Sequence, residues 1–174
     1  QGWSTLLETA KKINTLSNEA LQKPTGDKTS HIQWLEVINT LNNFKTTEGE
    51  ELGDVQSWNT DRVLIIDGLT GLTQMARSLQ SGSKPLLTQP DYGVIMNCIA
   101  QLLQYLTYQV RCHLVLISHI EMERDEVAGV LNKTVSTIGR KLAPTIPPLF
   151  DDVVIAEKNG NKFVWTTVAP DSDT

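Results

Sequence analysis

Two short apolar runs, Val63–Asp67 (VLIID) and His113–Ser118 (HLVLIS), constrain the fold of this 174-residue chain more than any other feature. Both runs are continuous rather than alternating between apolar and polar residues, which is typical of strands buried on both faces of a parallel sheet. Such strands need helices on both sides of the sheet. The sequence therefore predicts an α/β fold in which the two runs are neighbouring parallel strands.

A strongly amphipathic segment separates the two runs, from about Asp91 to Gln109. Its apolar residues recur at helical spacing and are Val94, Ile95, Cys98, Ile99, Leu102, Leu103 and Leu106. Strand, helix and strand in this order predict a β-α-β unit over residues 63–118. Helical spacing also predicts two earlier helices, over residues 4–16 and 30–44.

The C-terminal part has a different pattern. The runs Val153–Ala156 and Phe163–Thr166 flank Asn159-Gly160, a dipeptide that favours a two-residue hairpin turn. The complete pattern predicts a single domain over residues 1–174. Its fold would be a mostly parallel sheet flanked by helices, with a C-terminal antiparallel β-hairpin at the sheet edge.

The charge balance limits how the chain can bind nucleic acid. The sequence has 15 Lys and Arg against 20 Asp and Glu, which gives a formal net charge of −5. Electrostatic binding to phosphates requires clustered Lys and Arg, so any DNA binding has to be local, nucleotide-dependent or built across subunits. Cys98 and Cys112 form no CxxC pair, and no apolar run is long enough to span a membrane. These features favour a reducing cytoplasm.

The residues that follow the two apolar runs, Asp67-Gly68 and Ser118-His119, are the candidate site, because ligands bind outside the carboxyl ends of strands in an open α/β sheet. A strand-end carboxylate can hold Mg²⁺, although a strand-end Asp can equally serve a turn or a helix cap. His119 should lie close to Asp67. It is a candidate sensor of a nucleotide phosphate or an attacking water, and its alternative role is that of a hydrogen-bonded strand-end His.

A long charged segment, residues 120–138, follows the second run and shows no clear apolar periodicity. Loops of this length are usually functional or disordered, and a solvated surface excursion is the alternative. Arg140 and Lys141 close the segment, and three prolines then exclude a regular helix before Phe150. Cations at a loop edge are most often solvated, but next to a γ-phosphate either one could stabilise the charge that develops in phosphoryl transfer.

Three segments occur in the order and spacing of a RecA-like ATPase core: VLIIDGLTGL at residues 63–72, HLVLISH at 113–119 and IGRKLAPTIPPLFDDVV at 138–154. The chain most resembles the phage nucleotide-binding proteins, RecA-like ATPases associated with single-strand annealing. The resemblance runs from about Asp61 to the C-terminus. It implies a RecA-like fold, ATP and Mg²⁺ as cofactors, and a cytoplasmic protein that acts on single-stranded DNA as a ring or filament.

By position, the resemblance implies roles for individual residues. Asp67 corresponds to the Walker B aspartate that holds Mg²⁺, with Gly68 beside the nucleotide, and His119 corresponds to a polar sensor. Arg140 and Lys141 fall where the family places cations that reach the nucleotide of a neighbouring subunit. Residues 81–92 and 120–138 correspond to two DNA-facing loops, whose candidate contacts are Ser81, Ser83, Lys84, Arg124 and Lys133.

The family's phosphate-binding motif, GxxxxGK[ST], does not occur in the 174 residues. The simplest interpretation is that the natural start lies upstream of Gln1 and that the P-loop strand and helix precede it. The intact protein would then be a DNA-dependent ATPase. The alternatives are a non-hydrolysing scaffold of the same fold that binds DNA or a partner, and a packaging or helicase motor on the same core.

Overall fold

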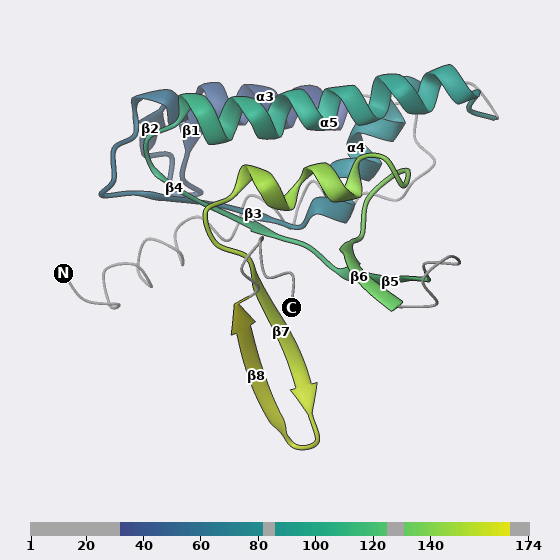
Figure 1. Ribbon diagram of the computed structural model, residues 1–174. Helices are drawn as coiled ribbons and strands as arrows, with labels where there is room; N and C mark the ends of the chain where they lie inside the picture. Colours follow the sequence, from purple (N-terminus) through teal and green to yellow (C-terminus); the bar gives the residue numbers. More distant parts are fainter. Residues whose placement is uncertain (1–31, 82–85, 125–130, 168–174) are drawn as a thin grey trace.

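Two parallel strands, β3 (Val63–Asp67) and β4 (His113–Ile117), form the centre of the molecule (Figure 1). The computed structural model describes residues 32–81, 86–124 and 131–167. The two strands pair in register along their whole length, from Val63 opposite His113 to Asp67 opposite Ile117. The prediction that the two apolar runs are neighbouring parallel strands is confirmed.

Two helices connect β3 to β4, where the sequence predicted one. The additional helix is α4 (Leu69–Ser81), whose buried residues Leu69, Leu72, Met75 and Ala76 recur at helical spacing. The predicted helix is α5 (Gln89–Gln109). It begins slightly earlier than expected because the Asp91 carboxylate accepts hydrogen bonds from the backbone N–H and the hydroxyl of Thr88, at 2.8 and 2.7 Å.

The core lies between the helices and one face of the strand pair. Figure 1 shows α3 (Ile32–Asn42) and α5 on the same side of β3 and β4. The buried cluster includes Trp34 and Leu41 of α3, Leu64 of β3, and Ile95, Ile99, Leu103 and Leu106 of α5. Burial of one such side chain contributes about 1.5–3 kcal/mol, so this cluster holds the helices on the strand pair. The helix predicted over residues 4–16 lies outside the described residues.

The prediction of a mostly parallel sheet flanked by helices is wrong. The described strands form four separate two-stranded sheets, of which only β3–β4 is parallel. The antiparallel pairs join β1 (Phe44–Lys45) to β2 (Glu51–Gly53), β5 (Ile120–Arg124) to β6 (Leu131–Val135), and β7 (Val154–Asn159) to β8 (Lys162–Thr167). Each of these strands pairs with its neighbour along the chain, where loop closure costs the least entropy. None of them extends the parallel pair.

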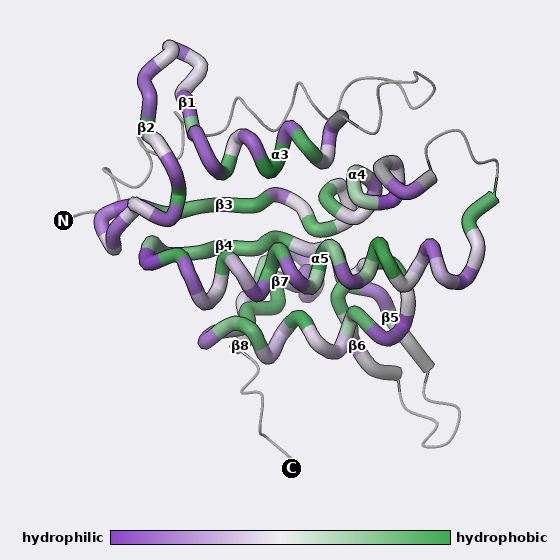
Figure 2. Tube along the Cα trace, turned by 90° about the horizontal axis from the view of Figure 1, so that it is seen from above, coloured by the Kyte–Doolittle hydropathy of each residue, from purple (hydrophilic) through white to green (hydrophobic). Residues whose placement is uncertain are grey.

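The two-sided burial predicted for the apolar runs is also wrong for β4. Its side chains alternate: Leu114 and Leu116 pack against the core, whereas Val115 and Ile117 are 43% and 46% exposed. Figure 2 shows β3 and β4 as hydrophobic along most of their length, so hydropathy alone does not reveal the difference between the faces. The helices decide it, because α3 and α5 lie on one side only.

The charged segment after β4 contains an antiparallel hairpin in place of the predicted loop. β5 pairs with β6, and residues 125–130 between them lie outside the described residues. The sequence does hold a signal for β5, because Ile120 and Met122 alternate with Glu121 and Glu123. Both apolar side chains are exposed, so the alternation in β5 does not correspond to burial of Ile120 and Met122.

The C-terminal hairpin predicted from the sequence is confirmed, but its turn and its position differ. Asn159 pairs with Lys162, so the two turn residues are Gly160 and Asn161. Gly160 has a φ of +61°, a left-handed conformation that glycine adopts without steric cost. The hairpin forms a sheet of its own and projects from the body of the molecule (Figure 1), not from the edge of the parallel pair.

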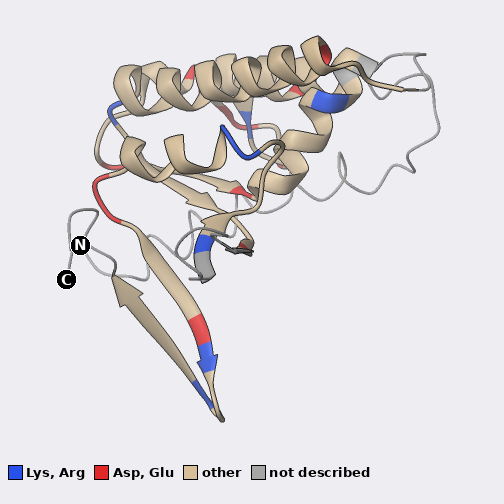
Figure 3. Ribbon diagram, turned by 45° about the vertical axis from the view of Figure 1, so that its right-hand side comes forward, with Lys and Arg blue, Asp and Glu red and all other residues tan. Residues whose placement is uncertain are grey.

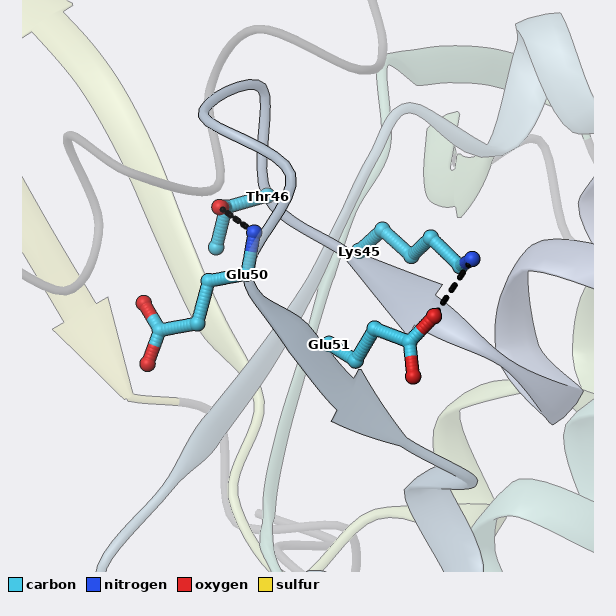
Figure 4. A network of polar contacts seen from close by, with 4 residues as sticks. All are labelled: Lys45, Thr46, Glu50 and Glu51. Atoms are coloured by element: carbon cyan, nitrogen blue, oxygen red, sulfur yellow. Dashed lines mark hydrogen bonds and ion pairs between the residues drawn. The ribbon is translucent and has the colours of Figure 1, made fainter.

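A tight turn joins β1 to β2 at the corner shown in Figure 4. The backbone N–H of Glu50 donates a hydrogen bond of 3.1 Å to the hydroxyl of Thr46. An ion pair of 2.7 Å joins Lys45 Nζ to Glu51 Oε1 across the two strands. The hydrogen bond from Lys45 and its positive charge lower the pKa of the Glu51 carboxyl from its usual value.

The same corner holds the residues that lead into β3. The buried indole of Trp58 packs edge-on against Phe44, with ring centroids 5.2 Å apart, and donates a hydrogen bond of 2.9 Å to the carbonyl oxygen of Leu52. The Arg62 guanidinium lies 5.2 Å from the centroid of the Trp58 ring and donates to the same carbonyl at 3.1 Å. These contacts fix the entry of the chain into β3.

Candidate functional site

The carboxyl ends of β3 and β4 bring four predicted site residues together. Because Asp67 lies opposite Ile117, the following residues Gly68, Ser118 and His119 lie at the same edge of the strand pair. A Cβ atom at Gly68 would be 3.4 Å from the carbonyl oxygen of Ile117, so the two chains approach closely at this point. The peptide bond between Asp67 and Gly68 is cis. The register thus places Asp67 and His119 at the same edge of the strand pair.

Hydrogen bonds connect the chain after β4 to the end of β6. The backbone N–H of Ser136 donates to the carbonyl oxygen of His119 at 2.8 Å, and the Ser118 hydroxyl donates to the same oxygen at 2.9 Å. The Ser136 hydroxyl donates to Glu121 Oε1 at 2.5 Å. The backbone at His119 is therefore held from two sides, while its side chain is exposed.

Hydroxyl groups in the first turns of α4 contact the segment that directly follows β6. The Thr70 hydroxyl donates to the carbonyl oxygen of Ser136 at 3.5 Å, and the hydroxyls of Thr73 and Thr137 are 3.2 Å apart. The sequence analysis identified none of these hydroxyl residues. Thr70 and Thr73 are separated from their partners by 66 and 64 positions, so no local pattern could have revealed the contacts.

The donor atoms at this edge suit Mg²⁺ better than a softer metal. Asp67 is exposed, and none of the other described residues forms a hydrogen bond or ion pair with its carboxylate. Within the described ranges there is no group of three or more His, Cys, Asp or Glu that could enclose a metal ion. A single exposed strand-end carboxylate is an oxygen ligand of the kind that Mg²⁺ accepts when phosphate oxygens complete its coordination. The glycine-rich cradle for those phosphates has no counterpart in the sequence.

Arg140 and Lys141 are exposed on a short segment that is anchored on both sides. On one side, Gly139 has a φ of +75°, and a Cβ atom there would lie 2.8 Å from the Met96 sulfur of α5. On the other side, Leu142 is buried immediately before the 3₁₀ turns η2 (Ala143–Thr145) and η3 (Pro147–Leu149). The absence of a regular α-helix in this proline-containing segment agrees with the prediction. Among the described residues, Lys141 forms no ion pair with Asp67.

The candidate DNA contacts lie on different elements. Ser81 is the last residue of α4, Arg124 is the last residue of β5, and Ser83 and Lys84 lie outside the described residues. Lys133 of β6 forms an ion pair with Glu157 of β7. Figure 3 shows the described Lys and Arg residues on separate elements, not in one patch. The distribution of the described Lys and Arg residues does not by itself identify a DNA-binding surface.

The first predicted DNA-facing segment, residues 81–92, is only partly a loop. Its last residues already belong to α5. The side-chain amide of Gln80 donates to Asp91 Oδ1 at 2.7 Å, which ties the last turn of α4 to the first turn of α5. Asp91 is buried, so this contact is a structural link between the helices.

Comparisons with protein-family models, with curated proteins and with solved structures found no significant match for this chain. In the described part of the chain, no helix combines the length and the apolar character that crossing a membrane requires.

Proposed function

We propose that the full-length protein binds ATP with Mg²⁺, hydrolyses it and acts on single-stranded DNA in phage recombination or replication. The observation that carries this proposal is the position of Asp67. It is an exposed carboxylate at the carboxyl end of β3, opposite Ile117, and Ser118 and His119 follow Ile117 at the same edge of the strand pair. Ligands of α/β proteins bind at this position, and Walker B carboxylates occur there.

The proposed role of each residue follows from its place at this edge. Asp67 would hold Mg²⁺, and Gly68 allows close approach because it has no side chain. The exposed His119 would contact a phosphate or the attacking water, on a backbone that Ser118 and Ser136 hold in place. Arg140 and Lys141 would act on the nucleotide of a neighbouring protomer. Phosphate binding itself would require a P-loop from outside the 174 residues.

The second candidate function is a non-hydrolysing scaffold that binds DNA or a recombination partner. Phosphoryl transfer depends on positioning and on stabilisation of phosphate charge, and the P-loop backbone and lysine supply much of both. A full-length protein without this motif would keep the surface at Asp67 but would not turn over ATP. The two candidates therefore differ in one measurable property.

ATP hydrolysis by the full-length protein, with and without single-stranded DNA, tests the proposal. We expect Mg²⁺-dependent hydrolysis that DNA stimulates, and Asp67→Ala should lower the rate by about 100-fold or more. Asp61→Ala is the matched control, because Asp61 is an exposed carboxylate just before β3 and should leave the rate unchanged. Wild-type turnover by Asp67→Ala would rule out the Walker B role. Absence of hydrolysis in the wild-type protein, with retained DNA binding, would favour the scaffold.

A further inference from the structure

The β7–β8 hairpin, residues 154–167, is an arm with one aromatic face. Figure 1 shows it projecting away from the helices and the parallel strand pair. Residues opposite each other in an antiparallel pair share a face, and alternate residues along a strand do so as well. From the register, one face carries Val154, Ala156, Lys158, Phe163, Trp165 and Thr167. We call this surface the arm face.

Two aromatic side chains dominate the arm face, and both are almost fully exposed. Phe163 is 81% exposed and Trp165 is 78% exposed. They are two positions apart on β8, so their Cα atoms are separated by about 6.8 Å and their rings stand side by side. Single exposed apolar residues are common, but two aromatic rings in a row on a projecting hairpin form a surface that a ligand can cover.

The charges around the rings are positive, although the whole chain has a formal charge of −5. Lys158 lies directly opposite Phe163 on the arm face, whereas Lys162, which follows the turn, lies on the opposite face. The only carboxylate of the hairpin, Glu157, belongs to the opposite face and is paired with Lys133. By the register, the arm face therefore combines two aromatic residues with a lysine and carries no Asp or Glu.

We propose that the arm face is a stacking platform for single-stranded DNA. Two successive bases stack on Phe163 and Trp165, and the Lys158 ammonium contacts the adjacent phosphate. Proteins that bind single strands without sequence preference combine aromatic platforms with positive charge in this way. A purely apolar protein partner would leave Lys158 without a counter-charge. The choice of single-stranded DNA as the ligand rests on the proposed function, whereas the location of the surface rests on the arm itself.

Binding of the full-length protein to fluorescein-labelled oligo(dT), followed by fluorescence anisotropy, tests this proposal. Trp165→Leu and Phe163→Leu keep an apolar side chain but remove the ring. Each should weaken binding by about 5- to 100-fold, because loss of stacking on one base has an effect of this size. Trp165→Phe keeps a ring and should bind within about threefold of the wild type. Lys158→Gln should reduce the dependence of log K on log salt by about one.

Tyr108→Leu is the matched control, because Tyr108 is also an aromatic residue, 74% exposed, but lies near the end of α5. Its oligo(dT) affinity should not change. Tryptophan fluorescence gives a second readout. Of the four tryptophans, Trp34 and Trp58 are buried, and Trp3 is the same in wild type and variant, so quenching by oligo(dT) that is lost in Trp165→Phe reports on Trp165. Unchanged thermal unfolding of each variant shows that the arm substitutions leave the fold intact.

The possible outcomes distinguish a failure of the arm proposal from a failure of the proposed function. Equal affinity of wild type, Trp165→Leu and Phe163→Leu would overturn the arm proposal, while DNA-stimulated ATP hydrolysis would still support the proposed function. A loss of affinity that sedimentation traces to dissociation of an oligomer would also overturn it, because the arm face would then be an interface between copies. No binding of oligo(dT) by the wild type, with or without ATP, would overturn the arm proposal and the DNA part of the proposed function together.

Discussion

Asp67 and Ile117 lie opposite each other in the last rung of the parallel β3–β4 pair. This register puts the Asp67 carboxylate at the open end of the pair, where it is exposed and none of the other described residues binds it. The same rung sets the position of Ser118 and His119, which follow Ile117 directly. The apolar core packs against one face of the strand pair and holds this register. The proposed chemistry depends on the register, because it sets the positions of Asp67, Ser118 and His119.

An exposed carboxylate of this kind should contribute little to folding. We expect Asp67→Ala to change the free energy of unfolding by less than about 0.5 kcal/mol, measured by urea denaturation. Leu64→Ala in the same strand should cost about 2–5 kcal/mol, because Leu64 is buried in the core. A loss above about 1.5 kcal/mol in Asp67→Ala would indicate a structural role for the carboxylate and weaken its assignment as a metal ligand.

Lys141 should act on the nucleotide of a neighbouring protomer. Hydrolysis by the full-length protein should then rise with protein concentration, and Lys141→Ala should lose hydrolysis but still bind ATP. Mixing Lys141→Ala with Asp67→Ala should restore part of the rate, because some interfaces would combine an intact Asp67 with an intact Lys141. If the mixture is as inactive as either variant although the two assemble together, Lys141 has no role in trans.

Gly139 should be more sensitive to substitution than Gly160, the other positive-φ glycine compared with it. In Gly139→Ala the new Cβ would meet the Met96 sulfur at 2.8 Å, in a left-handed conformation that already costs an L-residue about 1–2 kcal/mol. Gly160→Ala is the matched control, since its φ is also positive but no atom lies within 4 Å of the added Cβ. Gly139→Ala should be the less stable by about 1 kcal/mol or more in urea denaturation. Equal costs would mean that Met96 moves aside freely.

The ion pair between Lys45 and Glu51 should stabilise the protein only while Glu51 is ionised. Lys45 lowers the pKa of Glu51 in the folded state, so the stabilisation is present above the usual glutamate pKa of about 4.3 and is lost as the pH falls through the lower, folded value. Thermal melts of wild type and Glu51→Gln should differ at pH 7 and converge at about pH 2–3. Glu50→Gln, next to it and exposed, should follow the wild type at every pH. A constant difference between wild type and Glu51→Gln would contradict the pairing.

Several features could be predicted from the sequence because they depend on neighbouring residues. The apolar runs of β3 and β4, the helical spacing of α5 and the turn-forming residues between β7 and β8 are local patterns, and burial or backbone geometry translates them directly into structure. The position of Asp67 and His119 at the same edge of the strand pair followed from the same local information, because parallel strands end at the same edge.

The tertiary structure alone decided how the other strands pair and which groups surround the site. A continuous apolar run does not record whether helices cover one face or two, so the exposure of Val115 and Ile117 could not be predicted. The contacts of Thr70 with Ser136 and of Lys133 with Glu157 join distant parts of the chain, and no repeat or motif encodes them. Sequence periodicity thus determined the individual elements of this protein, whereas long-range packing, which depends on all elements together, decided their partners.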